Sequence, residues 1–381
     1  MRSVEHYEIA IVGGGIAGAS AAWALAGDGR EVAVVEREDS LAAHSTGRSA
    51  AQFLSSYSGP VNRELSAASL PFLQGDADGW AEHSLLAPRA VLWVAPESGE
   101  KRLGAIAAAN KAIGTNCEAI GVDSARALCP VLDPSWVHAG VVEHGGFDID
   151  VAELHQAYLR AARSTGATVK RHSGVRRMAR RGAGWQLDTD GPAIRADIVV
   201  NAAGAWADEI AEMAGAAPLG LTPCRRTIFT FASWHPSEHW PLVIGADESF
   251  YFKPEGAGQI LGSPADEHPD GPCDAKPREL DVAAGIEAIN QATNLDIRSI
   301  RSAWAGLRTF SPDRDPVVGF DRDIEGFFWC AGQGGTGIQT SPAIAALTAW
   351  LIGNGSSAPF EQPDLASLAP RLSPERFTAA A

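Results

Sequence analysis

Hydrophobic positions at the start of the chain fall into two short continuous runs with a longer run of small residues between them. The runs 7–12 and 31–36 are rich in β-branched residues, which is typical of buried strands. A glycine cluster between them leads into the apolar run 17–26, which predicts a helix. Strand, glycine turn, helix and strand within about 30 residues predict a βαβ unit with two parallel strands.

The rest of the chain alternates between this pattern and short segments typical of antiparallel strands. Helices are predicted at 63–73, 101–113, 151–164, 279–293 and 338–352 and from residue 206, and strands at 90–95, 196–201, 227–232, 250–253, 259–262, 317–320 and 327–331. We therefore predict an α/β fold: a Rossmann-like, parallel-sheet domain and an α+β substrate domain with a mainly antiparallel sheet. The first comprises residues 1–82, 146–219 and 306–381, and the second 83–145 and 220–305.

Composition narrows the choice of partners. The chain of 381 residues is long enough for two domains, and its 31 basic and 46 acidic residues give a net charge of −15, which disfavours nucleic acid. Five cysteines without a CxxC pair predict neither disulfides nor zinc. His235 and His239 have helical spacing, but Pro236 between them indicates a loop, so we predict no metal.

Targeting signals are not evident in the sequence. The apolar run 9–26 carries four glycines and no cleavage pattern follows it, and no window offers the roughly 20 apolar residues of a membrane-spanning helix. We expect a cytoplasmic protein without integral membrane association, and peripheral association with a membrane electron acceptor stays open.

The glycine cluster after the first strand has the G-x-G-x-x-G spacing of dinucleotide-binding loops. Gly13 would make the tight turn, Gly15 would let backbone approach a pyrophosphate, and Gly18 would pack helix against strand. The motif alone is weak, but here a strand precedes it and a helix follows. Glu36 ends the next strand, where its carboxylate would bind a ribose diol and repel a 2′-phosphate, which favours FAD or NAD over NADP.

Three further segments favour FAD over NAD. The segment 44–51 carries hydroxyls, a guanidinium and a predicted helix start suited to phosphate and flavin edges, although a plain capped loop is the alternative. The segment 202–206 lets backbone approach a cofactor. The segment 334–339 would place the N-terminus of the last helix near the negative charge of a reduced flavin.

These segments, in this order, resemble the D-amino-acid oxidase superfamily of flavoenzymes over nearly the whole chain. The resemblance rests on GGGIAGAS, VVERE, HSTGRSAA, VNAAGAW, PLGLTPCRRTIFTFA, DESFYFKP, AGLRTFSPDRDPVVG and GQGGTGIQTS. The likeness is greatest to the D-amino acid dehydrogenases, D-arginine dehydrogenase among them. It implies FAD, hydride transfer from the substrate Cα to the flavin, and hydrolysis of the imine to a keto acid.

The resemblance also implies how the cofactor is held. Some relatives attach the flavin through a cysteine where this chain has Gly306, so we expect non-covalent FAD. The position of an oxygen-activating lysine in sarcosine-oxidase-like relatives matches Ile260, so we expect a dehydrogenase that uses a quinone-like or dye acceptor, with O2 left open. The predicted cofactor-binding residues are Gly13, Gly15, Ile16, Ala17, Gly18, Glu36, Arg37, Ser45, Thr46, Arg48, Ser49, Ala50, Ala51, Val175, Ala203, Gly204, Trp206, Gly306, Arg308, Gly334, Gly335, Thr336, Gly337, Ile338, Gln339 and Thr340.

An amino acid substrate carries a carboxylate, which calls for an arginine fork beside the flavin. Arg226 and Arg308 match the family positions for this role, and Tyr251 resembles the tyrosine that donates to the same carboxylate. Tyr57 resembles a lid residue on a loop with Gly59 as hinge, with an ordinary loop aromatic as the alternative. Gln339 would hold the amine or the flavin edge, or merely cap the last helix. No His or Lys is placed as a base, so bound water or selection of the neutral amine is expected.

The substrate side chain is expected to meet an apolar pocket. Val91 occupies the position that supplies a carboxylate to cationic substrates in the family, so neutral, hydrophobic D-amino acids are expected, with D-arginine and D-lysine much poorer. Glu82, nearby in sequence, threatens this expectation. The predicted pocket residues are Gln52, Leu54, Val91, Leu242, Ile244 and Gly306. A glycine- or sarcosine-type amine oxidase, a 2-hydroxy-acid dehydrogenase and a non-catalytic flavin-binding subunit are the alternatives.

Overall fold

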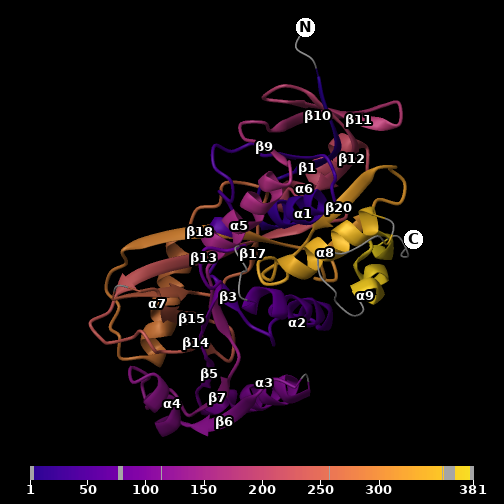
Figure 1. Ribbon diagram of the computed structural model, residues 1–381. Helices are drawn as coiled ribbons and strands as arrows, with labels where there is room; N and C mark the ends of the chain where they lie inside the picture. Colours follow the sequence, from indigo (N-terminus) through magenta and orange to yellow (C-terminus); the bar gives the residue numbers. More distant parts are fainter. Residues whose placement is uncertain are drawn as a thin grey trace.

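The structure, a computed structural model, describes residues 4–75, 80–112, 114–256, 258–353, 355 and 365–377. Its strands form two large sheets and one small sheet. In Figure 1 the sheet built around β1 lies at the top, and the sheet that contains β5, β14 and β15 lies below it. Segments from both ends of the chain meet in the upper part, since α1 packs against α8.

The first sheet has a parallel centre that the predicted βαβ unit begins. β1 (Glu5–Val12) pairs in parallel with β2 (Val32–Val35) and with β12 (Ile194–Asn201). The remaining strands of this sheet are β9 (Thr168–Lys170), β10 (Val175–Arg181), β11 (Gly184–Thr189), β19 (Val317–Phe320) and β20 (Phe327–Ala331). The strand centres are buried on both faces, which explains their continuous apolar runs.

Helices cover this sheet. α1 (Ile16–Gly27) contacts both α5 (Val151–Ser164) and α8 (Ser341–Ile352). The side chains of Ile9 and Ile11 face the cluster that includes these helices, whereas Ala10 and Val12 face a second cluster on the opposite side of the sheet. The other helices are α2 (Pro60–Gln74), α3 (Glu100–Ala112), α4 (Val122–Leu128), α6 (Ala207–Ala214), α7 (Glu279–Ala292) and α9 (Leu365–Leu372).

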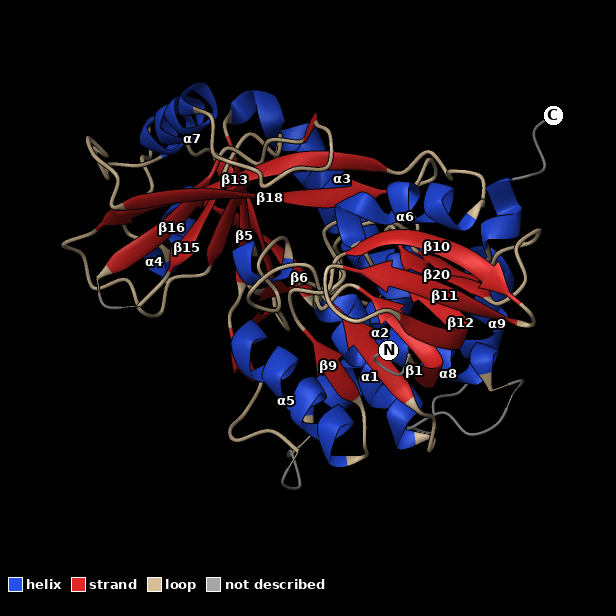
Figure 2. Cartoon of the chain, turned by 90° about the horizontal axis from the view of Figure 1, so that it is seen from above, coloured by secondary structure: helices blue, strands red, loops and turns tan. Residues whose placement is uncertain are grey.

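The second sheet is mainly antiparallel and has nine strands. Its strands are β5 (Val91–Ala95), β6 (Cys117–Gly121), β7 (Ala139–Glu143), β13 (Thr222–Ala232), β14 (Leu242–Gly245), β15 (Tyr251–Pro254), β16 (Gln259–Ser263), β17 (His268–Pro269) and β18 (Ser302–Phe310). Figure 2 shows β13 and β18 reaching from this sheet toward the first one. A small sheet of β3 (Gln52–Phe53), β8 (Phe147–Ile149) and β4 (Leu86–Pro88) lies between segments of both predicted domains.

The mixed α/β class with one parallel and one antiparallel sheet is confirmed. The predicted division into domains stays a prediction, and its boundary between residues 305 and 306 falls inside β18. Two local predictions are wrong. The last helix begins at Ser341 rather than at 338, because Gly334 has a left-handed φ of 54° and the following residues form turns. The helix start predicted within 44–51 is only a three-residue 3₁₀ turn, Thr46–Arg48.

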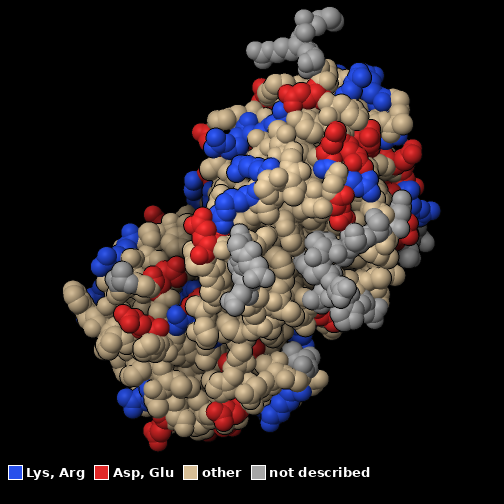
Figure 3. Space-filling view, viewed as in Figure 1, with Lys and Arg blue, Asp and Glu red and all other residues tan. Residues whose placement is uncertain are grey.

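The surface shows charges of both signs. On the face drawn in Figure 3, lysine and arginine side chains are interspersed with aspartate and glutamate over the described residues, and no extended basic stripe crosses this face. Within the described ranges, no helix is both long and apolar enough to cross a membrane.

Candidate active site

The glycine loop joins β1 to α1, and it brings backbone into close contact. Gly13 has a φ of +109°, and a Cβ there would lie 2.4 Å from the carbonyl oxygen of Ala202, at the end of β12. A Cβ on Gly18 would lie 1.9 Å from the carbonyl oxygen of Gly13. Any side chain at either position would therefore push the loop away from the strands that hold it. The turn and the helix–strand packing both require glycine.

Glu36 lies beside this loop, immediately after β2. Its carboxylate accepts hydrogen bonds from the backbone N–H of Gly14 at 2.8 Å and of Glu38 at 2.9 Å. The Arg37 guanidinium lies 3.7 Å from the centroid of a Trp206 ring. Glu36, Arg37 and Trp206 thus lie at one end of the predicted cofactor site. A ribose hydroxyl bound there would replace one of the backbone N–H groups that donate to the Glu36 carboxylate.

A cavity of about 230 Å³ extends from the glycine loop to the second sheet. Most of the predicted site residues line it: Gly15, Ile16, Ala17, Ser45, Thr46, Arg48, Ser49, Ala50, Ala51, Gln52, Leu54, Tyr57, Gly204, Arg226, Leu242, Ile244, Tyr251, Gly306, Arg308, Gly334, Gly335, Gly337, Ile338 and Gln339. The predicted residues that do not line it are Gly13, Gly18, Glu36, Arg37, Val91, Val175, Ala203, Trp206, Thr336 and Thr340. Residues from separate stretches of the sequence between positions 15 and 339 thus share one space.

Some of the residues outside the cavity have internal partners. The Thr336 hydroxyl donates to the Asn62 side chain at 2.7 Å, and the Thr340 hydroxyl donates to the carbonyl of Thr336 at 2.9 Å. Val175 is buried in the core cluster that also contains Val35. These side chains are held by the turn before α8 and by the sheet core, and their contact with the cofactor stays a prediction.

Two arginines on adjacent strands form the charged end of the cavity. β13 and β18 pair so that Arg226 lies opposite Gly306 and Cys224 lies opposite Arg308. Because side chains alternate along a strand, the two arginines share one face and are diagonal neighbours. Tyr251, on β15, lines the same cavity. We call Arg226, Arg308, Tyr251 and Tyr57 the carboxylate clamp.

The clamp contains hydrogen-bond donors that the protein leaves unused. Buried Nε of Arg226 and the buried hydroxyl of Tyr251 have no hydrogen-bond partner among the described residues. Arg308 donates to the Tyr57 hydroxyl at 3.0 Å, and an Arg226 Nη lies 3.7 Å from a Glu267 oxygen. Buried polar groups are normally satisfied, so these donors indicate an anionic ligand.

Burial and mutual repulsion shape the charges of the clamp. Burial lowers the pKa of Arg226, and the neighbouring guanidinium of Arg308 lowers it further. Burial also acts to lower the pKa of Arg308, but Tyr57, Tyr251 and the carboxylate of Glu267 more than offset this effect and raise it. Arginine stays protonated under ordinary conditions, so both side chains present positive charge to the cavity.

Gln339 holds the loop that carries Tyr57. Its side-chain oxygen accepts from the backbone N–H of Leu54, and its side-chain nitrogen donates to the carbonyl of Leu54, both at 3.1 Å. The same nitrogen donates to Ser66 at 2.7 Å. The amide therefore holds the loop 54–58, and it does not cap α8. Gln339 also lines the cavity, so its contact with an amine or a flavin edge stays a prediction.

The loop 54–58 carries Tyr57 into the clamp. The left-handed residue in this loop is Ser58, with a φ of 75°, whereas Gly59 has a φ of −71° and caps α2. The hinge at Gly59 stays a prediction. A Cβ on Gly335 would lie 3.2 Å from both Arg308 Nη1 and the Tyr57 hydroxyl, so glycine at 335 leaves space for the clamp.

An apolar wall borders the clamp in the same cavity. Ile244 on β14 lies directly opposite Tyr251 on β15 and beside Trp93 on β5. The wall consists of Leu54, Trp93, Ile228, Leu242, Ile244 and Ala265. Every side chain in it is a hydrocarbon except the indole of Trp93.

Val91 is fully buried but does not line the cavity, which corrects its predicted place in the pocket. It lies two residue pairs farther along the strands from Tyr251 than Trp93 does, and Gly146 packs against it: a Cβ on Gly146 would lie 3.1 Å from a Val91 methyl group. Glu82 does not line the cavity either, and its carboxylate lies 3.7 Å from Arg160 on the exposed surface. Glu82 therefore contributes no carboxylate to the lining of this cavity.

The sequence analysis missed several lining residues, chiefly Trp93, Ile228, Glu248, Ala265 and Thr309. Trp93 and Ile228 were detectable, because each is two residues from a predicted site residue on the same strand face. Glu248 lies in the turn between β14 and β15 with a left-handed φ of 58°, and is exposed at the cavity rim. Nothing in its sequence context indicates that position.

The residues present fit FAD. The N-terminus of α1, through Gly15 and Ile16, and the residues Ser45 and Ser49 line the same cavity as the clamp, so a dinucleotide held at the glycine loop would extend along this cavity toward the clamp. A Cβ on Gly306 would only reach ordinary contact, 3.5 Å from Arg48. No cysteine of the described residues lines the cavity.

A two-sheet fold with a dinucleotide loop leading to an arginine clamp defines a flavin-dependent oxidoreductase. Residues 8–351 match the DAO family model, described as FAD dependent oxidoreductase. The chain belongs to this family, and FAD is its cofactor.

Individual relatives are distant. The chain is 28% identical over 228 residues to the hydrogen cyanide synthase subunit HcnC of Pseudomonas aeruginosa, a match covering 56% of this chain and 52% of that protein. It is 26% identical to FAD-dependent oxidoreductase domain-containing protein 1 of Xenopus laevis, covering 92% of this chain and 80% of that protein. The fold is similar to that of L-proline dehydrogenase from P. horikoshii, with a TM-score of 0.84, 23% identity and 99% of both chains covered.

Proposed function

We propose that the protein oxidises the Cα–N bond of neutral, hydrophobic D-amino acids to give 2-keto acids and ammonia, as a dehydrogenase rather than an oxidase. The observation that carries this proposal is that the carboxylate clamp and the apolar wall line one cavity, with Ile244 of the wall beside Tyr251 of the clamp on neighbouring strands. A charged end and a hydrocarbon end match the two ends of an apolar amino acid. The preference for the D configuration is supported by the resemblance of the motifs to D-amino acid dehydrogenases.

The clamp residues would bind and orient the substrate. Arg226 and Arg308 form charge-assisted hydrogen bonds with the substrate carboxylate, and Tyr251 donates a further one. The bound FAD supplies the two-electron oxidant for the Cα–N bond. Holding the carboxylate fixes where Cα lies relative to the cofactor, which is the contribution expected from positioning.

The cavity offers no side-chain base for the substrate ammonium. No histidine or lysine of the described residues lines it, and its one carboxylate, that of Glu248, lies exposed at the rim. Without such a base, the substrate ammonium would lose its proton to water, or the protein would bind the neutral amine. The rate of substrate oxidation should therefore rise with pH as the neutral amine becomes more abundant.

The choice of dehydrogenase over oxidase is supported by the residues on β16. Ile260 packs in the core cluster that contains Phe231, and Leu261 packs in the cluster beside the cavity. Neither side chain carries a charge that would stabilise a reduced oxygen species. A slow reaction of the reduced enzyme with O2 is the expected result.

Anaerobic mixing of the FAD-loaded protein with D- and L-amino acids tests the proposal. D-leucine, D-methionine and D-phenylalanine should bleach the flavin absorbance band, and the Arg308→Met variant should show no bleaching with the same substrates. L-proline, glycine, sarcosine and 2-hydroxy acids belong in the panel. Fastest reduction by one of these would reassign the substrate, and no reduction by any would indicate a non-catalytic flavin-binding subunit.

A further inference from the structure

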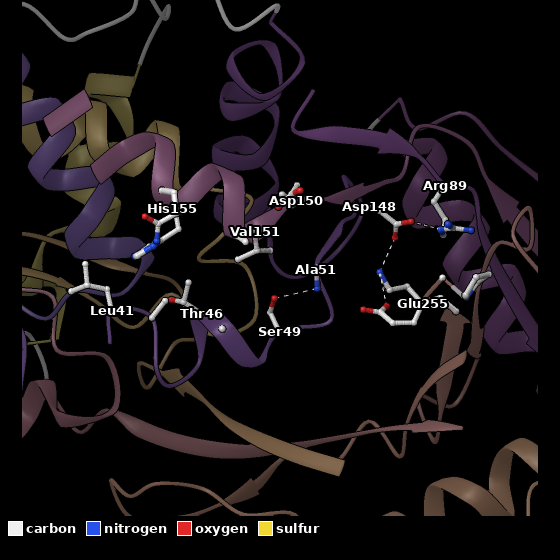
Figure 4. A pocket seen from close by; sticks show the side chains of 18 residues that line it. Leu41, Thr46, Ser49, Ala51, Arg89, Asp148, Asp150, Val151, His155 and Glu255 are labelled. Atoms are coloured by element: carbon white, nitrogen blue, oxygen red, sulfur yellow. Dashed lines mark hydrogen bonds and ion pairs between the residues drawn. The ribbon is translucent and has the colours of Figure 1, made fainter. Parts of the chain in front are cut away.

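A second cavity lies behind the backbone segment that lines the flavin cavity. It has a volume of about 660 Å³, and Thr46, Ser49 and Ala51 line both cavities. Ala51 has a left-handed φ of 55°, and its N–H donates to the Ser49 hydroxyl at 3.2 Å. Figure 4 shows this pair between the two walls of the second cavity. The barrier between the two cavities is therefore a single stretch of chain.

The two walls of the second cavity come from different parts of the fold. The first turns of α5, with Val151 and His155, form one wall, and the end of β15 with Lys253 and Glu255 forms the other. In Figure 4, Leu41 and His155 lie at one end, and Arg89 and Glu255 lie at the opposite end. Apolar side chains line much of the space: Leu41, Ile149, Val151, Ala152 and Pro254.

Charged side chains concentrate at the β15 end, where Lys253 is buried. The Lys253 side chain is only 4% exposed, and its ammonium donates to Asp148 at 2.8 Å and lies 3.8 Å from Glu255. Arg89 donates to the other Asp148 oxygen at 2.5 Å. With Asp150, the lining carries two cations and three anions, a net charge of −1. This charge disfavours anionic ligands, including nucleotides and phosphates.

We propose that this cavity binds the quinone that reoxidises the reduced FAD; this inference rests on the proposed dehydrogenase function. A quinone is neutral, presents an apolar ring to the hydrocarbon side chains, and has carbonyl oxygens that accept hydrogen bonds. An ammonium has three donors, and the described residues use one hydrogen bond and one longer ion pair of Lys253, which leaves a donor for a carbonyl.

The reaction balances with the groups named. Bound reduced FAD would pass two electrons across the separating backbone segment to the quinone and release one proton to water, and the quinone would take two protons from water, so that quinol forms and FAD returns to its oxidised state. The positive charge of Lys253 stabilises the negative charge that develops on the quinone oxygen before the proton arrives. Since the quinone has its own cavity, the amino acid product need not leave the carboxylate clamp first.

A bulky side chain on α5 that fills the second cavity tests the proposal. Ala152 is an exposed residue on α5 that lines the second cavity and does not line the flavin cavity. The Ala152→Trp variant should lose binding of a short-chain ubiquinone to the oxidised holoenzyme in calorimetry. Reoxidation of photoreduced FAD by this quinone should be slower by about tenfold or more. Flavin reduction by amino acids should be unchanged.

The matched control is Ala108→Trp, an exposed alanine on α3 that lines neither cavity and should leave binding and both half-reactions unchanged. Lys253→Met removes the donor without filling the space and should weaken quinone binding while the flavin cavity keeps its FAD. Wild-type quinone binding and reoxidation in Ala152→Trp would overturn the proposal. Photoreduction needs no amino acid, so this result is independent of whether the substrate assignment holds.

Discussion

The clamp and the wall are two ends of one cavity with opposite physical designs. At the clamp, two guanidinium groups are buried, and the Arg226 Nε and the Tyr251 hydroxyl have no hydrogen-bond partner among the described residues. At the wall, the hydrocarbon side chains of Leu242 and Ile244 are already buried against other residues and require no polar partner. A negatively charged ligand group therefore stabilises the clamp, whereas the wall selects ligands by disfavouring charged side chains. Substitutions at the clamp should therefore lower kcat/KM, whereas substitutions at the wall should change which substrate side chain is preferred.

The largest expected effect is at the clamp. Arg308→Met and, separately, Arg226→Met should retain FAD but reduce kcat/KM by roughly hundredfold or more, because losing a buried charged partner costs about 2–5 kcal/mol. Steady-state kinetics with D-leucine and the flavin content of each variant provide the measurement. Near-normal kcat/KM in either variant would remove that arginine from the clamp.

The wall should control the choice between neutral and basic side chains. The wild-type protein should prefer D-leucine over D-arginine by roughly hundredfold, since a buried cation without a partner costs a few kcal/mol. Ile244→Glu should shift this ratio toward D-arginine, whereas Val91→Glu, behind the wall, should shift it less. A kcat/KM series on both variants gives the ratio, and D-arginine as the best substrate of the wild type contradicts the assignment of the wall.

Tyr57 joins the loop to the clamp through one hydrogen bond with Arg308. Tyr57→Phe removes the acceptor and keeps the ring, so kcat/KM should fall by about tenfold, as expected for a hydrogen bond to a charged group. Phe53→Leu, on the buried strand before the loop, provides a packing control. A larger loss in the control than in Tyr57→Phe would show that loop packing, rather than the hydroxyl, supports activity.

The smallest expected effect lies behind the wall, at Glu143. This carboxylate is fully buried, accepts from Ser56 at 2.6 Å and from Asn110 at 3.2 Å, and burial raises its pKa above the ordinary 4.5. The folded protein therefore binds this proton more tightly than the unfolded chain does. Its contribution to stability is greatest below pH 4.5 and is lost as pH rises through the higher folded pKa.

Glu143→Gln should remove this dependence, so its Tm relative to the wild type should increase between pH 4.5 and pH 7. Thermal unfolding across that range, with the exposed Glu209→Gln on α6 as control, provides the measurement. A constant Tm difference would mean that Glu143 stays charged throughout.

Non-covalent attachment of FAD is a further prediction, independent of the comparison between clamp and wall. Heat or acid should release intact FAD from the protein, because Gly306 has no side chain that reacts with the flavin and no cysteine of the described residues lines the cavity. Flavin that stays with the denatured protein would contradict it.

Local sequence determined much of this molecule. The runs 7–12 and 31–36 and the glycines between them had to form a strand–turn–helix–strand unit, because the turn at Gly13 is open only to glycine and buried parallel strands need continuous apolar residues. Alternation along 222–232 and 302–310 likewise places Arg226 and Arg308 on defined faces of their strands.

Only the tertiary structure decided which of these faces meet and what each side chain touches. Strand register places Ile244 against Tyr251 and leaves Val91 covered by Gly146, a choice that depends on residues far apart in the chain. The amide of Gln339 pairs with Leu54, 285 residues away, so its role as a loop holder has no local signal. The second cavity exists because β15 and α5 approach the same backbone segment from two sides. Contacts of this kind follow from packing between distant elements, which a local pattern of residues does not encode.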